Sequence, residues 1–136
     1  MSKSNQTEND LMEYIFKSTA IPWSAAGNWF ISLHTADPGD AGNQTTSEAT
    51  YGGYARIQVV RSGAGWTVSG NQAQNAALVQ FPQCTSGSSI ATHVAIGTSL
   101  TGTGQILYSG ALSGALSIST GIQPQFSPGT LVVTED

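Results

Sequence analysis

Apolar and polar residues alternate with a period of two through most of the chain from Asn28 onward. In NWFISLHT, residues 28–35, Trp29, Ile31 and Leu33 share one face, and in IATHVAIG, residues 90–97, Ile90 falls in phase with Val94 and Ile96. Glycine-rich turns such as SGAG, TSGSS and SLTGTG separate the segments. Period two is the side-chain repeat of a β-strand, and short strands at this spacing are typical of antiparallel sandwiches. The sequence predicts a mainly β fold: an antiparallel β-sandwich or jelly-roll-like domain over residues 24–136.

A single segment with a helical pattern precedes the strands, over residues 7–19. Thr7 and Asp10 have the spacing of a capping box, and Pro22 disfavours helical angles at the residue before it. Four apolar side chains form one stripe along this helix: Leu11, Met12, Ile15 and Phe16. We expect residues 1–23 to form a short N-terminal helical arm. The stripe either packs on the chain's own sandwich or docks on a partner, and both alternatives stay open.

Charged residues are absent from more than half of the chain. Ser62 to Thr134, 73 consecutive residues, contain no Asp, Glu, Lys or Arg, and the net charge is −4. An acidic chain argues against a nucleic-acid partner, whose binding needs a basic surface. A surface without charges suits packing against neighbouring copies, because no charge must be desolvated on contact. The sequence therefore favours self-association, with a charge-poor monomer as the alternative.

Targeting and membrane segments are not visible in the sequence. The chain begins MSKSN with no apolar stretch behind it, which predicts synthesis in a host cytoplasm without a signal peptide. No apolar run approaches the roughly 18 residues of a membrane span. We expect no membrane partner.

Candidates for catalysis are few. Only His34 and His93 could act as bases near neutral pH, and no Gly-x-Ser-x-Gly nucleophile motif is present. The single cysteine, Cys84, excludes an internal disulfide and a cysteine-based zinc site. The sequence predicts no catalytic residue, no cofactor and no enzymatic activity.

The longest irregular segment, ADPGDAGNQTTSEATYGG, spans residues 36–53. Pro38 and Gly39 predict a type II turn led by Asp37. The alternative is a calcium site built on Asp37 and Asp40, with oxygens from Asn43 and Glu48, although their spacing does not match an EF-hand.

Aromatic side chains raise the alternative of carbohydrate binding by stacking. Trp29 alternates with Ile31 and Leu33, which indicates the core, and Trp66 follows a glycine-rich turn. The full set of candidates is Trp23, Trp29, Trp66, Tyr51 and Tyr54. Of these, Tyr51 and Tyr54 flank the long loop and are expected to be the better exposed.

Four motifs carry a resemblance to a known family: LHTADPG at 33–39, GYAR at 53–56, LYSGAL at 107–112 and LVVTED at 131–136. The order of these motifs resembles a family of small bacteriophage virion structural proteins, often labelled tail fibre proteins. The resemblance covers nearly the whole chain. It implies a non-enzymatic assembly protein on the outer surface of a phage particle.

A compact chain without shaft repeats, with an arm ahead of it, favours a capsid decoration (cement) protein within that class. Such a protein binds the outside of the head and stabilises the lattice of the major capsid protein, commonly as a homotrimer. The expected partner contacts are Leu11, Met12, Ile15, Phe16, Tyr51 and Tyr54. The alternative function is a tail fibre or tail-tip component that binds host surface glycans.

Overall fold

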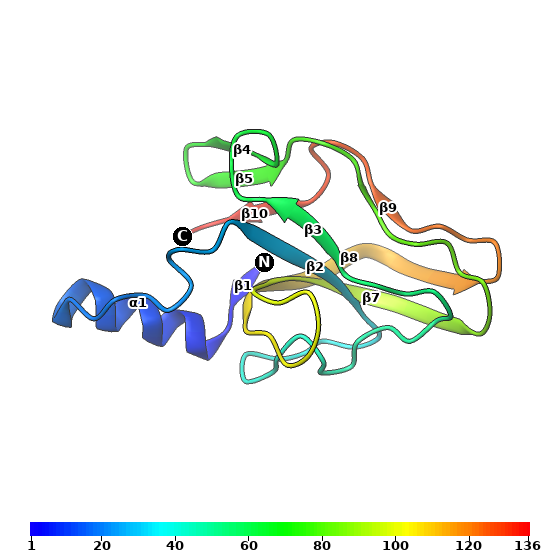
Figure 1. Cartoon of the computed structure of the whole chain (residues 1–136), viewed down its shortest axis with the longest axis horizontal. Coiled ribbons are helices and arrows are strands. Elements are labelled where there is room, and N and C mark those ends of the chain that lie inside the picture. The colour runs from blue at the N-terminus through cyan, green and yellow to red at the C-terminus, as the bar shows by residue number, and fades with distance from the viewer.

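The computed structural model describes all residues from Met1 to Asp136 (Figure 1). Its elements in chain order are β1 (Ser2–Lys3), α1 (Asn5–Lys17), β2 (Asn28–His34), β3 (Ile57–Val60), β4 (Trp66–Ser69), β5 (Gln72–Asn75), β6 (Val79–Gln80), β7 (Ser88–Gly97), β8 (Ile106–Ser119), β9 (Gln125–Phe126) and β10 (Val132–Thr134). The 13-residue α1 is the only helix, and no helix has the length and apolar character needed to span a membrane.

The strands form one large sheet and two small ones. The five-stranded sheet has the order β1-β8-β7-β2-β3, the second sheet has the order β10-β5-β4, and β6 pairs with β9. Every pairing is antiparallel. The apolar core draws side chains from all three sheets, including Ile31 and Val94 of the large sheet, Val133 of the second and Val79 of the pair. The predicted mainly β, antiparallel class is confirmed.

An irregularity in the pairing of β7 with β8 changes which side chains of β7 reach the core. Ala91 pairs with Leu116 but His93 pairs with Ala111, so the extra residues lie in β8. Such an irregularity bends the strands and breaks the simple alternation of buried and exposed side chains. Ala91 is therefore fully buried, whereas Ile90 is 56% exposed. Val94 and Ile96 are both buried, as their shared face predicts, but the prediction that Ile90 shares that face is wrong.

The helix begins and ends earlier than the sequence predicts. Ser4 has extended angles and its Oγ accepts from the Thr7 backbone N–H at 3.2 Å, so Ser4 is the N-cap and the capping box predicted at Thr7 is wrong. At the other end, Ser18 adopts a left-handed φ of 56°, and the Thr19 N–H donates to the Glu13 carbonyl. This is a Schellman-type end, which stops the helix before Pro22 can act on it.

Gln44 joins the long loop to the end of β7. Its side chain is fully buried: Nε2 donates to the Phe30 carbonyl at 3.1 Å, and Oε1 accepts from the Ser99 N–H at 3.0 Å. The amide fits there only because Gly97 and Gly104 lack side chains. A Cβ on either glycine would lie 2.1 Å from the Gln44 amide.

Replacing Gly97 with alanine is expected to lower the free energy of unfolding by about 1–3 kcal/mol, because the added methyl overpacks a buried site. The Gln44 amide cannot retreat without losing its hydrogen bonds to Phe30 and Ser99. Urea unfolding of the purified chain measures the effect. Gly114→Ala in β8 is the matched control, since a Cβ there meets open space. Equal losses in both variants would contradict the role of Gln44.

Candidate functional site

Polar side chains attach α1 to the start of β8. Thr7 and Asp10 are the buried residues of the helix. The Thr7 hydroxyl donates to the Ile106 carbonyl at 3.0 Å, and Asp10 Oδ2 accepts from Gln105 Nε2 and from Trp23 Nε1, each at 2.9 Å. Hydrogen bonds rather than apolar packing therefore hold this helix in place.

Three of the four side chains of the apolar stripe of α1, Met12, Ile15 and Phe16, lie on the side away from these contacts. Met12 is 56% exposed, Ile15 64% and Phe16 74%, while Leu11 is half-buried. A surface helix normally buries its apolar face and exposes its polar face, and α1 does the reverse. Figure 1 shows the helix extending beyond the sheets. Within the stripe, Leu11 alone packs on the chain's own domain, and Met12, Ile15 and Phe16 do not.

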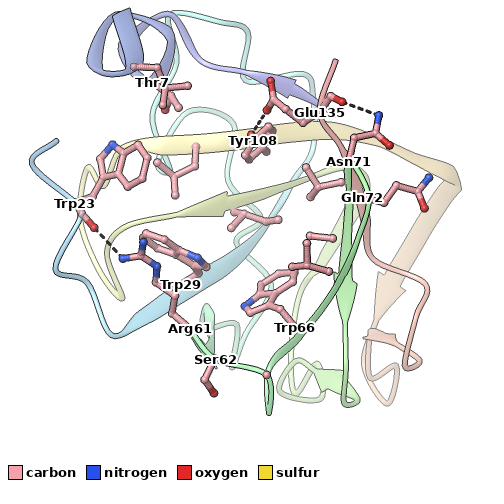
Figure 2. Close-up of a pocket in the computed structure, with 18 residues that line it drawn as sticks. Thr7, Trp23, Trp29, Arg61, Ser62, Trp66, Asn71, Gln72, Tyr108 and Glu135 are labelled. Carbon is pink, nitrogen blue, oxygen red and sulfur yellow. Dashed lines mark hydrogen bonds between the residues drawn. The ribbon is translucent and has the colours of Figure 1, made fainter. Parts of the chain in front are cut away.

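A pocket of about 860 Å³ lies beside α1 and contains all three tryptophans of the chain. Trp23 comes from the segment after the helix, Trp29 from β2 and Trp66 from β4 (Figure 2). The Trp23 and Trp29 rings meet edge to face, with centroids 6.0 Å apart. Other apolar side chains of the lining include Leu11, Val68, Leu107 and Val133. Sequence reasoning considered the tryptophans singly and missed the pocket, because strands distant in sequence form its walls.

Arg61 is the cation at this pocket. Its guanidinium carbon lies 4.9 Å from the centre of a Trp29 ring, a cation–π contact. The same guanidinium donates to the carbonyls of Ser24 at 2.7 Å and Ala26 at 3.1 Å. These bonds fix the segment between the helix and β2. The nearby indole Nε1 of Trp66 is buried and has no hydrogen-bond partner.

Glu135 is the pocket's carboxylate, and it is already engaged. It accepts hydrogen bonds from the Lys3 ammonium and the Tyr108 hydroxyl. The Lys3 bond, followed by that of Tyr108, lowers the pKa of Glu135. Burial, with the Glu135 contact second, raises the pKa of Tyr108. Glu135 thereby ties the C-terminus to β1 and β8.

The predicted exposure of Tyr51 and Tyr54 is wrong. Tyr51 is 2% exposed and Tyr54 is half-buried. The Tyr51 hydroxyl donates to the Pro82 carbonyl at 2.7 Å, and the Tyr54 ring stacks on Phe81 with centroids 6.3 Å apart. Burial raises the pKa of Tyr51 to about 12. The loop folds inward at these residues because large aromatic rings gain most from leaving water.

Glu48 and Arg56 form an ion pair beneath the same loop. Arg56 Nε donates to Glu48 Oε2 at 2.7 Å, and Arg56 Nη2 donates to Oε1 at 2.9 Å. The guanidinium also donates to the carbonyls of Ser99 and Gly102, at 2.9 and 2.7 Å. Burial and the hydroxyl bond to Glu48 raise the pKa of Tyr54. The pair thus joins the loop at 36–53 to the loop before β8. Because Arg56 occupies both carboxylate oxygens of Glu48, Glu48 is not free to bind a calcium ion.

Asp37 and Asp40, the residues of the calcium alternative, are exposed. Gly39 has a φ of 71° and its N–H donates to Asp37 Oδ1 at 2.8 Å, but the backbone turn lies further along, where the Gly42 N–H donates to the Gly39 carbonyl at 3.1 Å. No three His, Cys, Asp or Glu side chains in the chain gather as a metal site would need. Asp37 bonds the backbone as predicted, whereas the type II turn predicted at Pro38 and Gly39 is wrong, because the chain turns at residues 39–42 instead.

The two histidines are brought together, since His34 of β2 pairs with His93 of β7. His34 is fully buried. Its Nδ1 donates to the Thr46 carbonyl and its Nε2 accepts from the Ser32 hydroxyl, both at 2.8 Å. A carbonyl only accepts, which assigns the proton to Nδ1. Burial lowers the pKa of His34, and the Thr46 bond opposes this in part. Both ring nitrogens of His34 are therefore used within the fold.

Lowering the pH below the ordinary histidine value of 6.5 is expected to destabilise the fold. The unfolded chain then binds a proton that folded His34 resists, so the free energy of unfolding falls, by at most about 1.4 kcal/mol per pH unit. Urea unfolding from about pH 7.5 to 5 measures this slope. His34→Asn keeps a donor for Thr46 and should lose the slope, while the control His93→Asn should retain it. An unchanged slope in His34→Asn would count against His34 as the titrating group.

This small antiparallel β domain holds its helix by polar contacts and leaves an apolar stripe and an aromatic pocket open. Exposed apolar surface of this kind is typical of an assembly protein. The family comparison agrees with that class. Residues 2–134 match the family described as podophage GP4 fiber I protein gp80, and the chain belongs to this family. The predicted membership in a family of phage virion structural proteins is thereby confirmed. No curated protein matches the chain.

Proposed function

We propose that the protein is a structural component of the virion exterior that attaches to a neighbouring virion protein through the exposed stripe of α1. The inverted burial of this helix carries the proposal. Its polar side is used up in contacts with β8 and Trp23, and its apolar side is left in water. Burying an aliphatic or aromatic side chain contributes about 1.5–3 kcal/mol. Met12, Ile15 and Phe16 together therefore form a strong docking surface.

The family description supports a place in the fibre apparatus of the particle. In that role the small β domain is a module joined to other fibre or tail proteins by α1. Recognition of host glycans by this module requires that the aromatic pocket is open on the particle, because tryptophan faces are the surfaces on which sugars stack.

The second candidate is a capsid decoration protein with the major capsid protein as its partner and a homotrimer as its assembly. The absence of any elongated shaft in the structure supports it (Figure 1). A decoration protein stabilises the mature shell because it binds that state alone, and many copies act together. In both candidates the protein acts by binding and is not an enzyme.

Copy number separates the two candidates. Quantitative mass spectrometry of purified virions should give a few copies per particle for a fibre component and a number comparable to the major capsid protein for a decoration protein. Absence of the protein from purified virions would overturn both candidates.

A further inference from the structure

Two open apolar surfaces lie next to each other in every copy of this chain. One is the stripe of α1 and the other is the tryptophan pocket, and Leu11 belongs to both. Monomeric soluble proteins rarely leave a continuous apolar surface of this extent in water. Each surface needs a partner that is apolar and low in charge.

We propose that the pocket of each copy receives α1 of a second copy, with Ile15 and Phe16 packed against Trp29, Trp66 and Val68. The proposal rests on the proposed function and names the partner of the α1 stripe. A groove that takes an amphipathic helix contacts it at positions three and four residues apart. Met12, Ile15 and Phe16 have that spacing and are the most exposed apolar side chains of α1, together with Tyr14.

The distribution of charge supports a second copy as the occupant. Three of the four cations are paired with carboxylates: Lys3 with Glu135, Lys17 with Glu13 and Arg56 with Glu48. Arg61, at the pocket, is the cation without such a partner. On α1, Glu8 is exposed and forms no ion pair. The two unpaired groups have opposite charge and lie on the two surfaces that would meet.

Glu8 also lies on the correct side of the helix. It precedes Leu11 by three residues and Met12 by four, the spacings that place side chains on one helix face. An α1 seated in the pocket would therefore bring Glu8 toward the edge that Arg61 occupies. No other uncompensated charge lines the pocket, since Glu135 is bound by Lys3 and Tyr108. The contact leaves no lone charge to be desolvated.

Each copy carries one helix and one pocket, so every helix and every pocket is occupied only in a closed assembly. A pair of copies or a closed ring meets that condition. The homotrimer proposed for the decoration role would be such a ring, with each α1 in the pocket of the next copy.

Sedimentation equilibrium of the full chain tests the proposal, with wild type expected to form a closed oligomer. Ile15→Asp alters the stripe and Val68→Asp alters the pocket; these side chains are 64% and 71% exposed, so both variants should fold. Each should weaken self-association roughly tenfold to a hundredfold. Ile90→Asp is the matched control, because Ile90 is 56% exposed on β7 away from both surfaces and should leave the oligomer unchanged.

A charge variant tests the orientation. Glu8→Lys places a cation against Arg61 and should weaken association several-fold, an effect that salt reduces. Asp40→Lys makes the same reversal on an exposed loop residue and should have no effect.

Three results would overturn the proposal: a wild-type chain that stays monomeric, an oligomer that survives both Ile15→Asp and Val68→Asp, or oligosaccharides that bind a monomeric chain and change its tryptophan fluorescence. The last result would assign the pocket to glycans. A monomeric chain that still requires the α1 stripe to enter virions would leave the proposed docking function standing and remove only the second copy as partner.

Discussion

Replacing Arg56 with methionine is expected to lower the free energy of unfolding by about 3–5 kcal/mol. Methionine keeps much of the apolar stem but leaves the Glu48 carboxylate, only 16% exposed, without its cation. A buried charge that loses its partner costs far more than the pair itself contributes. The carbonyls of Ser99 and Gly102 lose their donors in the same step. The loops held by this pair should therefore loosen together.

Urea unfolding of the single variants and of the double variant Arg56→Met/Glu48→Met gives the measurement as a thermodynamic cycle. The double variant should recover a large part of the loss, because no unpaired charge remains buried. Lys17→Met is the control, since it breaks an exposed helical pair contributing about 0.3–0.5 kcal/mol. A loss below 1 kcal/mol in Arg56→Met, on the order of an exposed pair, would show that solvent compensates Glu48.

Replacing Phe16 with aspartate is expected to reduce the amount of protein in assembled virions at least tenfold. The reason is that the contact loses roughly 1.5–3 kcal/mol of apolar burial. Phe16 is 74% exposed, so the chain should keep its fold and stability. Complementation of a phage lacking the gene, followed by quantification of the protein in purified particles, measures this loss.

Ile90→Asp serves as the control for this variant, because it introduces the same charge at an exposed apolar residue outside α1. It should enter particles as wild type does. Wild-type incorporation of Phe16→Asp would refute attachment through α1, whichever virion protein is the partner.

The strands were predictable because the side-chain repeat of a strand is a local property. Ile31 and Leu33 alternate with Ser32 and His34 in sequence. The structure buries all four, because the long loop also contacts the polar side of β2 through Thr46. The irregular pairing of β7 with β8 has no such local signal, since it depends on the register of two strands. For that reason the core position of Ile90 was predicted wrongly.

The candidate site was predictable only in part. The apolar stripe of α1 is a pattern within a few turns of one helix, and its members could be named from the sequence. Its exposure could not, because it depends on Thr7 and Asp10 finding Ile106, Gln105 and Trp23. Tyr51 and Tyr54 failed as surface candidates for the same reason: their neighbours Pro82 and Phe81 lie about 30 residues away in sequence.

The sequence by itself determined the mainly β class, the single amphipathic helix and the family, because each depends on residues close together in the chain. The tertiary structure alone decided which face of α1 meets water, that Glu48 is held by Arg56, and that three tryptophans from three segments line one pocket. Those features arise from contacts between distant segments, whose pairing depends on the energy of the whole packed core.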